Sequence, residues 1–458
     1  MATQAARSYA QQLRLTKDSF LSQVENGAEL SGWVVSVGNE AGDLDSLASA
    51  LAYAHFADGQ GPESDSKRRH VPLFLSSRND LRLRPENLLA LEMAQVPVEA
   101  LLTIDDLPRD RLANLGTQFA LVDHNVLLDM FRSRPQDPAD AEDDARVVAI
   151  LDHHVDERKH LAANPRTVEL IGSCASLVTE HFYPSSAERS GAAQPERIPT
   201  PLADLLLSAI VIDTRLKPSA DGGKAAEVDL AAVQTLLPAS SFASALAVNA
   251  SSTSESSSSS SALDNLRAFN SRLSDAKEDV AHLSGHDLLR RDYKEYHEAS
   301  VRYGLSTVPL SLSTWLSNFD QPEEQAVETL VQEVRDWMDE RDLALAGVLT
   351  SYTHIKKSGA AGSRRREILV VARGAQADGS LAKLEQVFAG LEKDKVLELE
   401  EWKAKKTYGI DEGSNTGQQG AHDGWERWKV WQQGNARATR KQVAPALKDL
   451  VHGAFSHE

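Results

Sequence analysis

The sequence predicts a two-domain α/β protein with an N-terminal parallel sheet and a smaller C-terminal α/β domain. Three observations support this prediction. The length of 458 residues exceeds that of one ordinary domain. Short apolar stretches alternate with helical stretches over roughly 120 residues, an order typical of βαβ units. The pattern changes near residue 285, so we expect domains at residues 1–284 and 285–458.

The segment Trp33–Ser46 organises the N-terminal domain. Trp33–Val37 is short, apolar and β-prone, and helix-forming residues follow the segment, so we expect a buried strand, a turn and a helix. The turn carries Asn39, Asp43 and Asp45 at the carboxyl end of the strand, where open α/β sheets bind ligands. An acid in this position can also simply cap the helix, and one such turn leaves both interpretations open.

Later elements repeat this pattern of a strand followed by polar side chains. We expect strands at Val71–Leu75, Leu101–Ile104, Phe119–Val122 and Val147–Leu151, and helices at Leu88–Ala94, Leu177–Phe182 and Leu202–Ile212. Asp123 follows one of these strands, and Asp152, His153 and His154 follow another, while Asp213 ends the last helix. Because the carboxyl ends of parallel strands lie at one edge of a sheet, these side chains should gather there.

The residue types in these clusters favour divalent cations. Carboxylate oxygens with one or two imidazoles suit Mg²⁺, Mn²⁺ or Co²⁺, and six or more ligands are too many for one ion. Two cations about 3.5–4 Å apart that share a carboxylate are suited to displacement at phosphorus, since they neutralise phosphate oxygens and generate hydroxide. Each cluster alone could be a loop acid or a surface histidine pair, but their recurrence after successive elements favours a two-metal centre.

The composition limits the partners of the protein. A formal charge of −18 argues against nonspecific nucleic-acid binding, so an anionic substrate must be attracted by bound cations or a local basic cluster. The single cysteine, Cys174, excludes internal disulfides and fits a reducing compartment. No apolar run approaches the ~20 residues of a membrane span. We expect a soluble cytoplasmic monomer that binds neither nucleic acid nor membrane. Residues 1–17 contain basic but no acidic side chains, which leaves the mitochondrial matrix as an alternative.

Several other segments carry weaker signals. The serine-rich residues 239–262 predict a disordered insertion. Gly172–Ser176 begins a helix whose first N–H groups could bind an anion, although many helices begin in this way. In the C-terminal domain we expect strands near Tyr303–Pro309, Leu343–Thr353 and Ile368–Ala372, a helix near Glu324–Arg341, and polar loops at residues 356–365 and 405–424. Trp425, Trp428 and Trp431 are interpreted as packing residues, and Cys174 as a buried small residue.

Four motifs together resemble the DHH phosphoesterase superfamily. They are Gly38–Ser46, Val122–Asn125, Asp152–His154 and Ile212–Thr214, in that order. Arg437–Pro445 is similar to the basic signature of the second (DHHA2) domain of the family, so the resemblance covers about residues 30 to 455. The sequence is most similar to the fungal exopolyphosphatases, which are related to family II inorganic pyrophosphatases and to the prune proteins.

The resemblance implies two ion sites that share Asp123. The first ion would be held by Asp43 and Asp123, with Asn39 beside it. The second ion would be held by Asp45, Asp123, His153 and Asp213. The pyrophosphatases carry a metal-binding histidine at the position of Asn39, whereas the exopolyphosphatases carry asparagine. Because an amide oxygen is a weaker ligand than imidazole, the first ion should be held less tightly and Mg²⁺ should compete better with Mn²⁺.

The resemblance also implies roles for residues beyond the ions. His154 would lie against the bridging water or the phosphate, and Asp152 would hold an imidazole by its ring N–H. Lys294, Arg440 and Lys441 would bind phosphate across a cleft between the two domains, with Arg440 and Lys441 also offsetting charge during catalysis. Arg364–Arg366, with Lys356 and Lys357, could extend this basic track, but the favoured interpretation is a solvated hairpin loop.

The implied activity is an exopolyphosphatase, which hydrolyses the terminal phosphoanhydride of inorganic polyphosphate and releases orthophosphate. Three alternatives remain open at this point. The protein could be an inorganic pyrophosphatase like those of family II, although Asn39 argues against it. It could be a prune-like phosphodiesterase or short-chain polyphosphatase, or a non-catalytic scaffold that keeps the fold.

Overall fold

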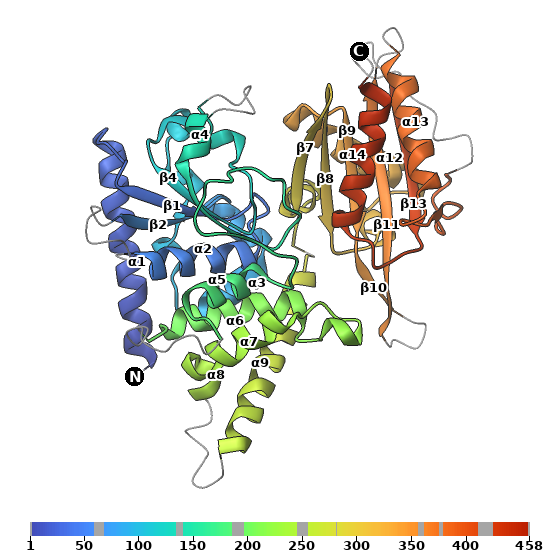
Figure 1. Ribbon diagram of the computed structural model, residues 1–458. Helices are drawn as coiled ribbons and strands as arrows, with labels where there is room; N and C mark the ends of the chain where they lie inside the picture. The colour runs from blue at the N-terminus through green and yellow to red at the C-terminus, as the bar shows by residue number, and fades with distance from the viewer. Residues whose placement is uncertain are drawn as a thin grey trace. The chain divides into compact units, whose positions relative to one another are not determined.

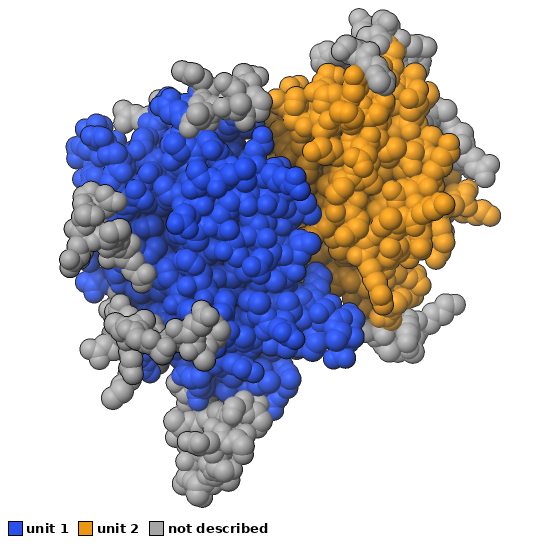
Figure 2. Space-filling view, viewed as in Figure 1, with its two compact units in different colours: residues 1–277 blue, residues 278–458 orange. Residues whose placement is uncertain are grey.

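The computed structural model describes residues 2–58, 68–133, 141–185, 197–244, 255–280, 282–355, 361–374, 379–410 and 425–456. The chain forms two compact units, residues 1–277 and 278–458 (Figure 2). Both units contain a sheet covered by helices, so the predicted α/β class is confirmed. The division between the units falls a few residues before the one that we expected from the sequence.

Unit 1 contains a six-stranded sheet in the order β3-β2-β1-β4-β5-β6. Its strands are β1 (Trp33–Val37), β2 (Arg69–Phe74), β3 (Leu102–Thr103), β4 (Gln118–Val122), β5 (Val147–Asp152) and β6 (Arg166–Val168). All five pairings between neighbouring strands are parallel. The predicted N-terminal parallel sheet is therefore confirmed, and the strand order reverses direction between β1 and β4.

Helices cover both faces of this sheet (Figure 1). They are α1 (Ala2–Glu25), α2 (Leu44–Ala57), α3 (Pro85–Met93), α4 (Ala141–Arg146), α5 (Cys174–Phe182), α6 (Thr200–Thr214), α7 (Glu227–Leu236), α8 (Ser241–Ser244) and α9 (Glu255–Glu278). Side chains alternate along β1, so Val34 packs into the core that includes α2, α5 and α6, whereas Val35 and Val37 pack on the opposite face with Phe20 of α1. The whole of β1 is buried as a result.

The serine-rich segment differs from the predicted disorder. Residues 245–254 lie outside the described residues, but the remaining serine run belongs to α9, and Ser241–Ser244 forms α8. Serine lowers helix stability only modestly. The helix is anchored further along by Leu266, Phe269 and Leu273, which recur at helical spacing and are buried in the core of unit 1. Burial of this apolar stripe therefore outweighs the weak local preference of the serines.

Unit 2 contains a mixed sheet in the order β12-β13-β11-β9-β8-β7, with β10 paired to β11. Its strands are β7 (Tyr293–Glu298), β8 (Val301–Val308), β9 (Leu345–Thr350), β10 (Tyr352–Ile355), β11 (Ala361–Gly374), β12 (Leu399–Glu401) and β13 (Trp425–Gln433). Strands β8 and β9 are parallel, and the other pairs are antiparallel. Its helices are α10 (Gly285–Arg291), α11 (Leu312–Ser317), α12 (Glu323–Arg341), α13 (Ser380–Lys393) and α14 (Arg440–Phe455).

The two faces of this sheet have separate cores. One contains residues of α10, α11 and α12, and the other contains residues of α13 and α14. Trp428 packs against the first core and Trp431 is buried in the second, so both are packing residues. Among the described helices of the protein, none combines the length and apolar character that crossing a bilayer requires.

The basic hairpin also differs from the prediction. Arg364–Arg366 lies within strand β11 rather than in a solvated loop. Arg366 is only 9% exposed, because its strand pairs with β13 at this point. Lys356 and Lys357 lie outside the described residues. The predicted polar loop at residues 405–424 is described only as far as residue 410.

A buried acid on α6 gives a first prediction, on stability. Asp204 is 2% exposed, and burial raises its pKa to about 6. An acid with a raised pKa contributes stability that is present below its unfolded value of about 3.9 and is lost as the pH rises through 6. The Asp204→Asn substitution keeps the oxygen that accepts a hydrogen bond from the Ser241 N–H. We expect the variant to be about 1–3 kcal/mol more stable than the wild type at pH 8, with no gain at pH 4, in urea unfolding. An equal gain at both pH values would contradict this explanation.

Candidate metal centre

The candidate site lies where the order of the parallel sheet reverses. Strands β1 and β4 are neighbours, yet the chain continues from β1 toward β2 and from β4 toward β5. The loops after such strands diverge and leave room for a ligand. Asn39 follows β1, Asp123 follows β4, and His153 and His154 follow β5, so the topology brings these residues to the same edge, as expected.

The turn between β1 and α2 requires two glycines. A side chain at Gly38 would place its Cβ 2.6 Å from the Cβ of Ser46. Gly42 has φ +55°, and a Cβ there would lie 2.4 Å from the Oγ of Ser76. The turn delivers Asp43 to the N-cap of α2, where its Oδ1 accepts a hydrogen bond of 3.0 Å from the Ser46 N–H. Asp43 therefore caps α2 through one of its two carboxylate oxygens.

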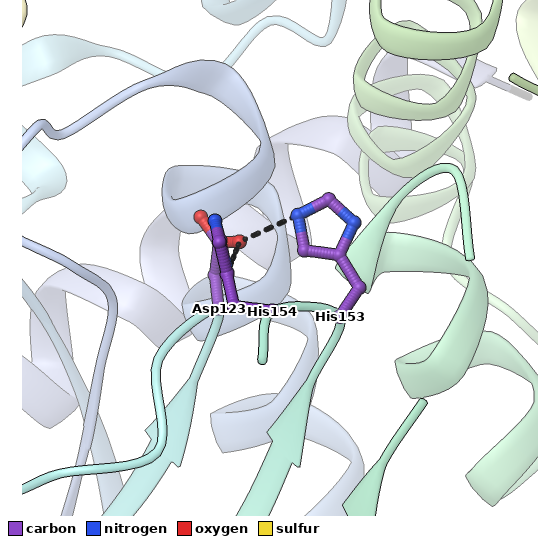
Figure 3. Close-up of side chains that lie close together, drawn as sticks. All are labelled: Asp123, His153 and His154. Atoms are coloured by element: carbon purple, nitrogen blue, oxygen red, sulfur yellow. Dashed lines mark ion pairs between the residues drawn. The ribbon is translucent and has the colours of Figure 1, made fainter. Parts of the chain in front are cut away.

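Asp123 occupies the centre of the site. It is 1% exposed and has φ +63°, a left-handed conformation that few residues other than glycine, asparagine and aspartate adopt. Its Oδ1 lies 3.1 Å from the Nε2 of His153 and 3.6 Å from the Nδ1 of His154. The three side chains point toward one another from the ends of two strands (Figure 3). Within the described residues, they form a group whose ligand atoms all lie within 4.8 Å of one another.

The amide of Asn39 is turned differently from the sequence expectation. Its Nδ2 donates hydrogen bonds to the Oδ2 of Asp123 at 2.7 Å and to the Asp123 carbonyl at 3.2 Å. Its Oδ1 accepts a hydrogen bond from the Ala41 N–H at 2.9 Å. The amide oxygen is thus directed at the backbone of its own loop. Asn39 acts here as a donor that orients the Asp123 carboxylate, rather than as an oxygen ligand.

The two histidines are held by different partners. The Nδ1 of His153 lies 3.2 Å from the Ile171 carbonyl, which fixes a proton on Nδ1 and directs Nε2 at Asp123. The Nδ1 of His154 lies 2.8 Å from Oδ1 of Asp152. Asp152 in turn accepts a hydrogen bond of 2.5 Å from the Nδ2 of Asn125. Asp152 therefore holds an imidazole, as expected from the sequence, and the imidazole is that of His154.

Asp45 is bound by the start of helix α5. Its Oδ1 accepts hydrogen bonds from the Ser173 hydroxyl at 2.9 Å and the Ala175 N–H at 2.8 Å, and its Oδ2 accepts one from the Cys174 N–H at 2.7 Å. The sequence indicates only that this helix start could bind an anion, and the anion that it binds is the carboxylate of Asp45. The contact also directs Oδ2 to within 3.8 Å of the His153 Nε2.

Acidic residues crowd around this group. Burial raises the pKa of Asp45, and the charges of Asp123, Asp213 and Asp43 raise it further, while His153 opposes them. Burial also raises the pKa of Asp213, which lies in the last turn of α6; Asp43 adds to that shift, and Lys277 and His153 oppose it. Asp45 is therefore close enough to each of the other predicted acidic ligands for their charges to raise its pKa, although Asp123 is the only acid in the group whose ligand atoms all lie within 4.8 Å of one another in the described residues. Repulsion among them would be relieved by a bound cation.

Asp123 behaves in the opposite way. Burial alone would raise its pKa, but the His153 and His154 rings and the Ser46 hydroxyl lower it below the ordinary value. The carboxylate is therefore ionised. Its Oδ1 is buried and accepts no hydrogen bond from the described residues, although two imidazoles face it. An ionised oxygen of this kind, beside two imidazole nitrogens and further carboxylates, is a donor set that fits a divalent cation.

Sequence reasoning missed three residues that position the site. Ser46 donates a 2.6 Å hydrogen bond from its hydroxyl to Oδ2 of Asp123. Asn125 holds Asp152, and Ser173 holds Asp45. Ser46 and Asn125 lie within the motifs Gly38–Ser46 and Val122–Asn125, so their closeness in sequence to Asp45 and Asp123 could have identified them. No local signal links Ser173 with Asp45, because 128 positions separate them.

The predicted basic residues for phosphate binding, Lys294, Arg440 and Lys441, lie in unit 2. Arg440 is the first residue of α14 and bonds Asp292 twice, through Nη1 to the carbonyl and through Nη2 to Oδ1, both at 2.8 Å. Lys441 is exposed in the same helical turn. Lys294 lies in strand β7, two residues after Asp292. Asp292 therefore connects the Arg440 guanidinium to the segment that carries Lys294.

Comparison with known proteins identifies both halves of the chain. The model of the DHH family N-terminal domain matches residues 33–210, and that of the DHHA2 domain matches residues 271–450. A Schizosaccharomyces pombe protein named "Putative exopolyphosphatase" is 28% identical over 418 residues, which cover 90% of each chain. "Exopolyphosphatase PRUNE1" of Mus musculus is 29% identical over 287 residues, which cover 62% of this chain and 54% of that protein.

Two further relatives are pyrophosphatases by name. A "Probable manganese-dependent inorganic pyrophosphatase" of Shouchella clausii is 29% identical over 186 residues, covering 39% of this chain and 47% of that protein. The solved structure of a Methanococcus jannaschii "putative family II inorganic pyrophosphatase" shares the fold, with a TM-score of 0.51 and 20% identity over 92% of this chain and 99% of that chain. The chain therefore belongs to the DHH family of phosphoesterases and carries a DHH domain followed by a DHHA2 domain.

Proposed function

We propose that this protein is an exopolyphosphatase, which hydrolyses the terminal phosphoanhydride of inorganic polyphosphate and releases orthophosphate. The observation that carries the proposal is the buried, ionised Oδ1 of Asp123, which faces two imidazoles and accepts no hydrogen bond from the described residues. The Schizosaccharomyces pombe relative, which matches over 90% of each chain, supports the choice of substrate.

Two divalent cations would be held by Asp43, Asp45, Asp123, His153 and Asp213. When bound, such cations offset the charge of phosphate oxygens and make hydroxide available near neutral pH. The protein holds the ligands in position. Asp45 is held by the start of α5, and Asp123 is held by hydrogen bonds from Asn39 and Ser46. His153 is held by the Ile171 carbonyl. The bacterial relatives named as manganese-dependent support Mn²⁺, alongside Mg²⁺ and Co²⁺, as ions to test.

His154 has a separate role in this proposal. Burial alone would raise the pKa of Asp152, but its hydrogen bonds with His154 and Asn125 lower it, so Asp152 is an ionised acceptor. It accepts a hydrogen bond from the Nδ1–H of His154. The Nε2 of that ring could accept a proton and, once protonated, donate a hydrogen bond to a phosphoryl oxygen. The side chain of His154 is 26% exposed, so this nitrogen is accessible to substrate.

Lys294, Arg440 and Lys441 would bind the phosphate chain. Lys441 is exposed at the start of α14, where the helix dipole also favours an anion. The hydrogen bonds that Arg440 donates to Asp292 hold its guanidinium in one orientation. This would reduce the entropy lost when a phosphate binds.

The direct test is release of orthophosphate from long-chain polyphosphate by the purified protein. We expect release with Mg²⁺, Mn²⁺ or Co²⁺, one phosphate at a time from the chain end, and none in EDTA. Release of long internal fragments would contradict terminal attack. Absence of hydrolysis with every one of these cations would disprove the proposal.

Inorganic pyrophosphatase is the second candidate, because relatives in sequence and in fold carry that name. Asn39 argues against it, since its amide donates to Asp123 where the pyrophosphatases have a histidine ligand. We expect a higher kcat/KM for long-chain polyphosphate than for pyrophosphate under Mg²⁺. The reverse order would favour pyrophosphatase.

The hydrogen bonds of Asn125 lead to a prediction about His154. The Asn125→Ala substitution removes the donor to Asp152 and the bond to the Val155 carbonyl, so the His154 ring loses its fixed acceptor. We expect a roughly 10–100-fold loss of kcat on polyphosphate, the range typical of residues that support ligands, with little change in KM. Glu157→Ala is a control, because its N–H bonds Asn125 but its side chain does not. An unchanged kcat in a folded Asn125→Ala variant would contradict the role.

A further inference from the structure

Arg366 is a buried cation that has no acidic partner in the described part of the chain. It is 9% exposed, and its Nε donates a 3.0 Å hydrogen bond to the Ala436 carbonyl. No described carboxylate lies within ion-pair distance of its guanidinium. Burial and, to a smaller extent, the charge of Arg364 lower the pKa of Arg366 to about 10. An unpaired buried charge is costly, and such positions are more common at binding sites than elsewhere in a fold.

The neighbouring acidic side chains, Glu367 and Glu278, bond groups other than Arg366. Glu367 is adjacent in sequence but points to the opposite face of the sheet, where it accepts hydrogen bonds from the Leu312 N–H, the Tyr352 hydroxyl and the Trp402 ring. Glu278 lies 3.4 Å from Nη1 of Arg364. The two nitrogens of the Arg366 fork that do not bond Ala436 therefore have no anionic partner among the described residues.

The surroundings of Arg366 add positive charge. Arg364 lies two residues earlier in β11 and so projects from the same face of the strand, with its Nε bonded to the Ser351 hydroxyl at 2.9 Å. Arg437 follows Ala436 and is exposed. The segment whose Ala436 carbonyl bonds Arg366 therefore also contains an exposed basic residue, Arg437. This concentration of charge occurs on a protein whose net charge is −18, so it is a local feature.

We propose that Arg366, with Arg364 at its rim, is an oxyanion-binding site of unit 2 that takes a phosphoryl group of inorganic polyphosphate. The choice of polyphosphate rests on the proposed function. A guanidinium fork with two nitrogens available matches two oxygens of one phosphoryl group. Arg364 and Arg366 do not belong to the predicted set of Lys294, Arg440 and Lys441.

A purely structural role for Arg366 is the main rival explanation. Its bond to Ala436 could serve only to hold the loop between β13 and α14, which Gln433 also holds through the Asn435 and Ala438 carbonyls. In that case substitution would lower thermal stability and leave anion binding unchanged. The two explanations therefore differ in which measurement responds.

The test is calorimetric binding of tripolyphosphate to the full chain in EDTA, where metal-dependent hydrolysis cannot occur. We expect Arg366→Gln to weaken binding by about tenfold or more, as for loss of a hydrogen bond between charged groups, and Arg366→Lys to weaken it less. Arg365→Gln is the matched control, since it removes the same charge one residue away on the other face of β11. A repeat in a Lys441→Gln background separates this site from the start of α14.

Each outcome decides the matter. Unchanged binding by a folded Arg366→Gln or Arg366→Lys variant, or equal losses in Arg365→Gln, would overturn the site. If Arg366→Gln does not fold, Arg364→Gln and Arg366→Lys carry the test. Equally tight, Arg366-dependent binding of a single-stranded DNA oligonucleotide would overturn the substrate class. Arg366-dependent binding by a protein that hydrolyses no polyphosphate would support the site and reject the proposed function.

Discussion

We expect Asp123→Asn to lower orthophosphate release from polyphosphate by about 10³-fold or more. The Oδ1 of the carboxylate faces both imidazoles, and its Oδ2 accepts hydrogen bonds from Asn39 and Ser46. An amide at this position loses the negative charge and cannot serve two cations at once. Cations contribute several kcal/mol to stabilising a phosphoryl transition state, and each 1.36 kcal/mol corresponds to a tenfold change in rate.

Asparagine is the appropriate substitute because of the backbone. Asp123 has φ +63°, and asparagine adopts this conformation more readily than alanine does, so the variant should fold. Asp105→Asn is a matched control: it also follows a strand of the same sheet, but its carboxylate bonds the Arg78 N–H, away from the metal centre. Rates and circular dichroism would be compared for the two variants. Full orthophosphate release by Asp123→Asn would remove Asp123 from the proposed cation site, whereas full function of the variant in cells without hydrolysis would favour a scaffold role.

The strands of unit 1 could be predicted because their signals are local. Trp33–Val37 and Phe119–Val122 are short apolar runs, and both are buried strands. Each is followed by polar residues of the site. Parallel pairing then places the ends of these strands together without any further information. The meeting of Asp123 with His153 and His154 follows from this geometry.

The detailed bonding of the site could not be predicted, because it depends on contacts that are distant in sequence. Asp45 is bound by the N–H groups of Cys174 and Ala175, and the Asn39 amide is oriented by Asp123. A sequence shows which residues can accept or donate a hydrogen bond. It does not show which of the possible partners forms the hydrogen bond in the folded protein, since that depends on how α5 packs beside β1 and α2.

Unit 2 was less predictable for a different reason. Strand β7 reads Tyr293–Glu298 and contains four polar residues, and β13 interrupts its tryptophans with charged side chains. Edge strands and strands with one solvated face lack the continuous apolar run that marks a central strand. The central strands β8 and β9, which are mostly buried, were predicted close to their observed positions.

The acidic residues proposed to hold the cations lower the stability of the fold when no cation is bound. Asp43 raises the pKa of both Asp45 and Asp213, and Asp213 also raises that of Asp45, which means that the charged forms repel in the folded protein. Such a cluster destabilises the fold at neutral pH when no cation is bound. A cation reverses this effect because it binds only the folded arrangement. Stability should therefore depend on divalent ions more strongly than in a protein whose acids are paired with arginines.

We expect Asp213→Asn to separate these two properties. Burial raises the pKa of Asp213, so its charge costs stability as the pH rises above about 3.9, its unfolded value. In EDTA at pH 8 the variant should melt at a higher temperature than the wild type. Addition of Mn²⁺ at about 100 times its dissociation constant should stabilise the wild type by about 2.7 kcal/mol, or by roughly 5–10 °C. The variant should show a much smaller shift and at least about a 100-fold loss of phosphate release.

Asp204→Asn is the matched control, because Asp204 lies on the same helix, is buried, and also has a raised pKa, but its carboxylate bonds the Ser241 N–H away from the metal centre. Both variants should gain stability in EDTA at pH 8, since both remove a buried charge. Only Asp213→Asn should lose the Mn²⁺-induced shift and the activity. Equal Mn²⁺ shifts in the two variants would remove Asp213 from the ligand set, and a loss of stability for Asp213→Asn in EDTA would show that its charge is already balanced, with Lys277 the nearest source of compensation.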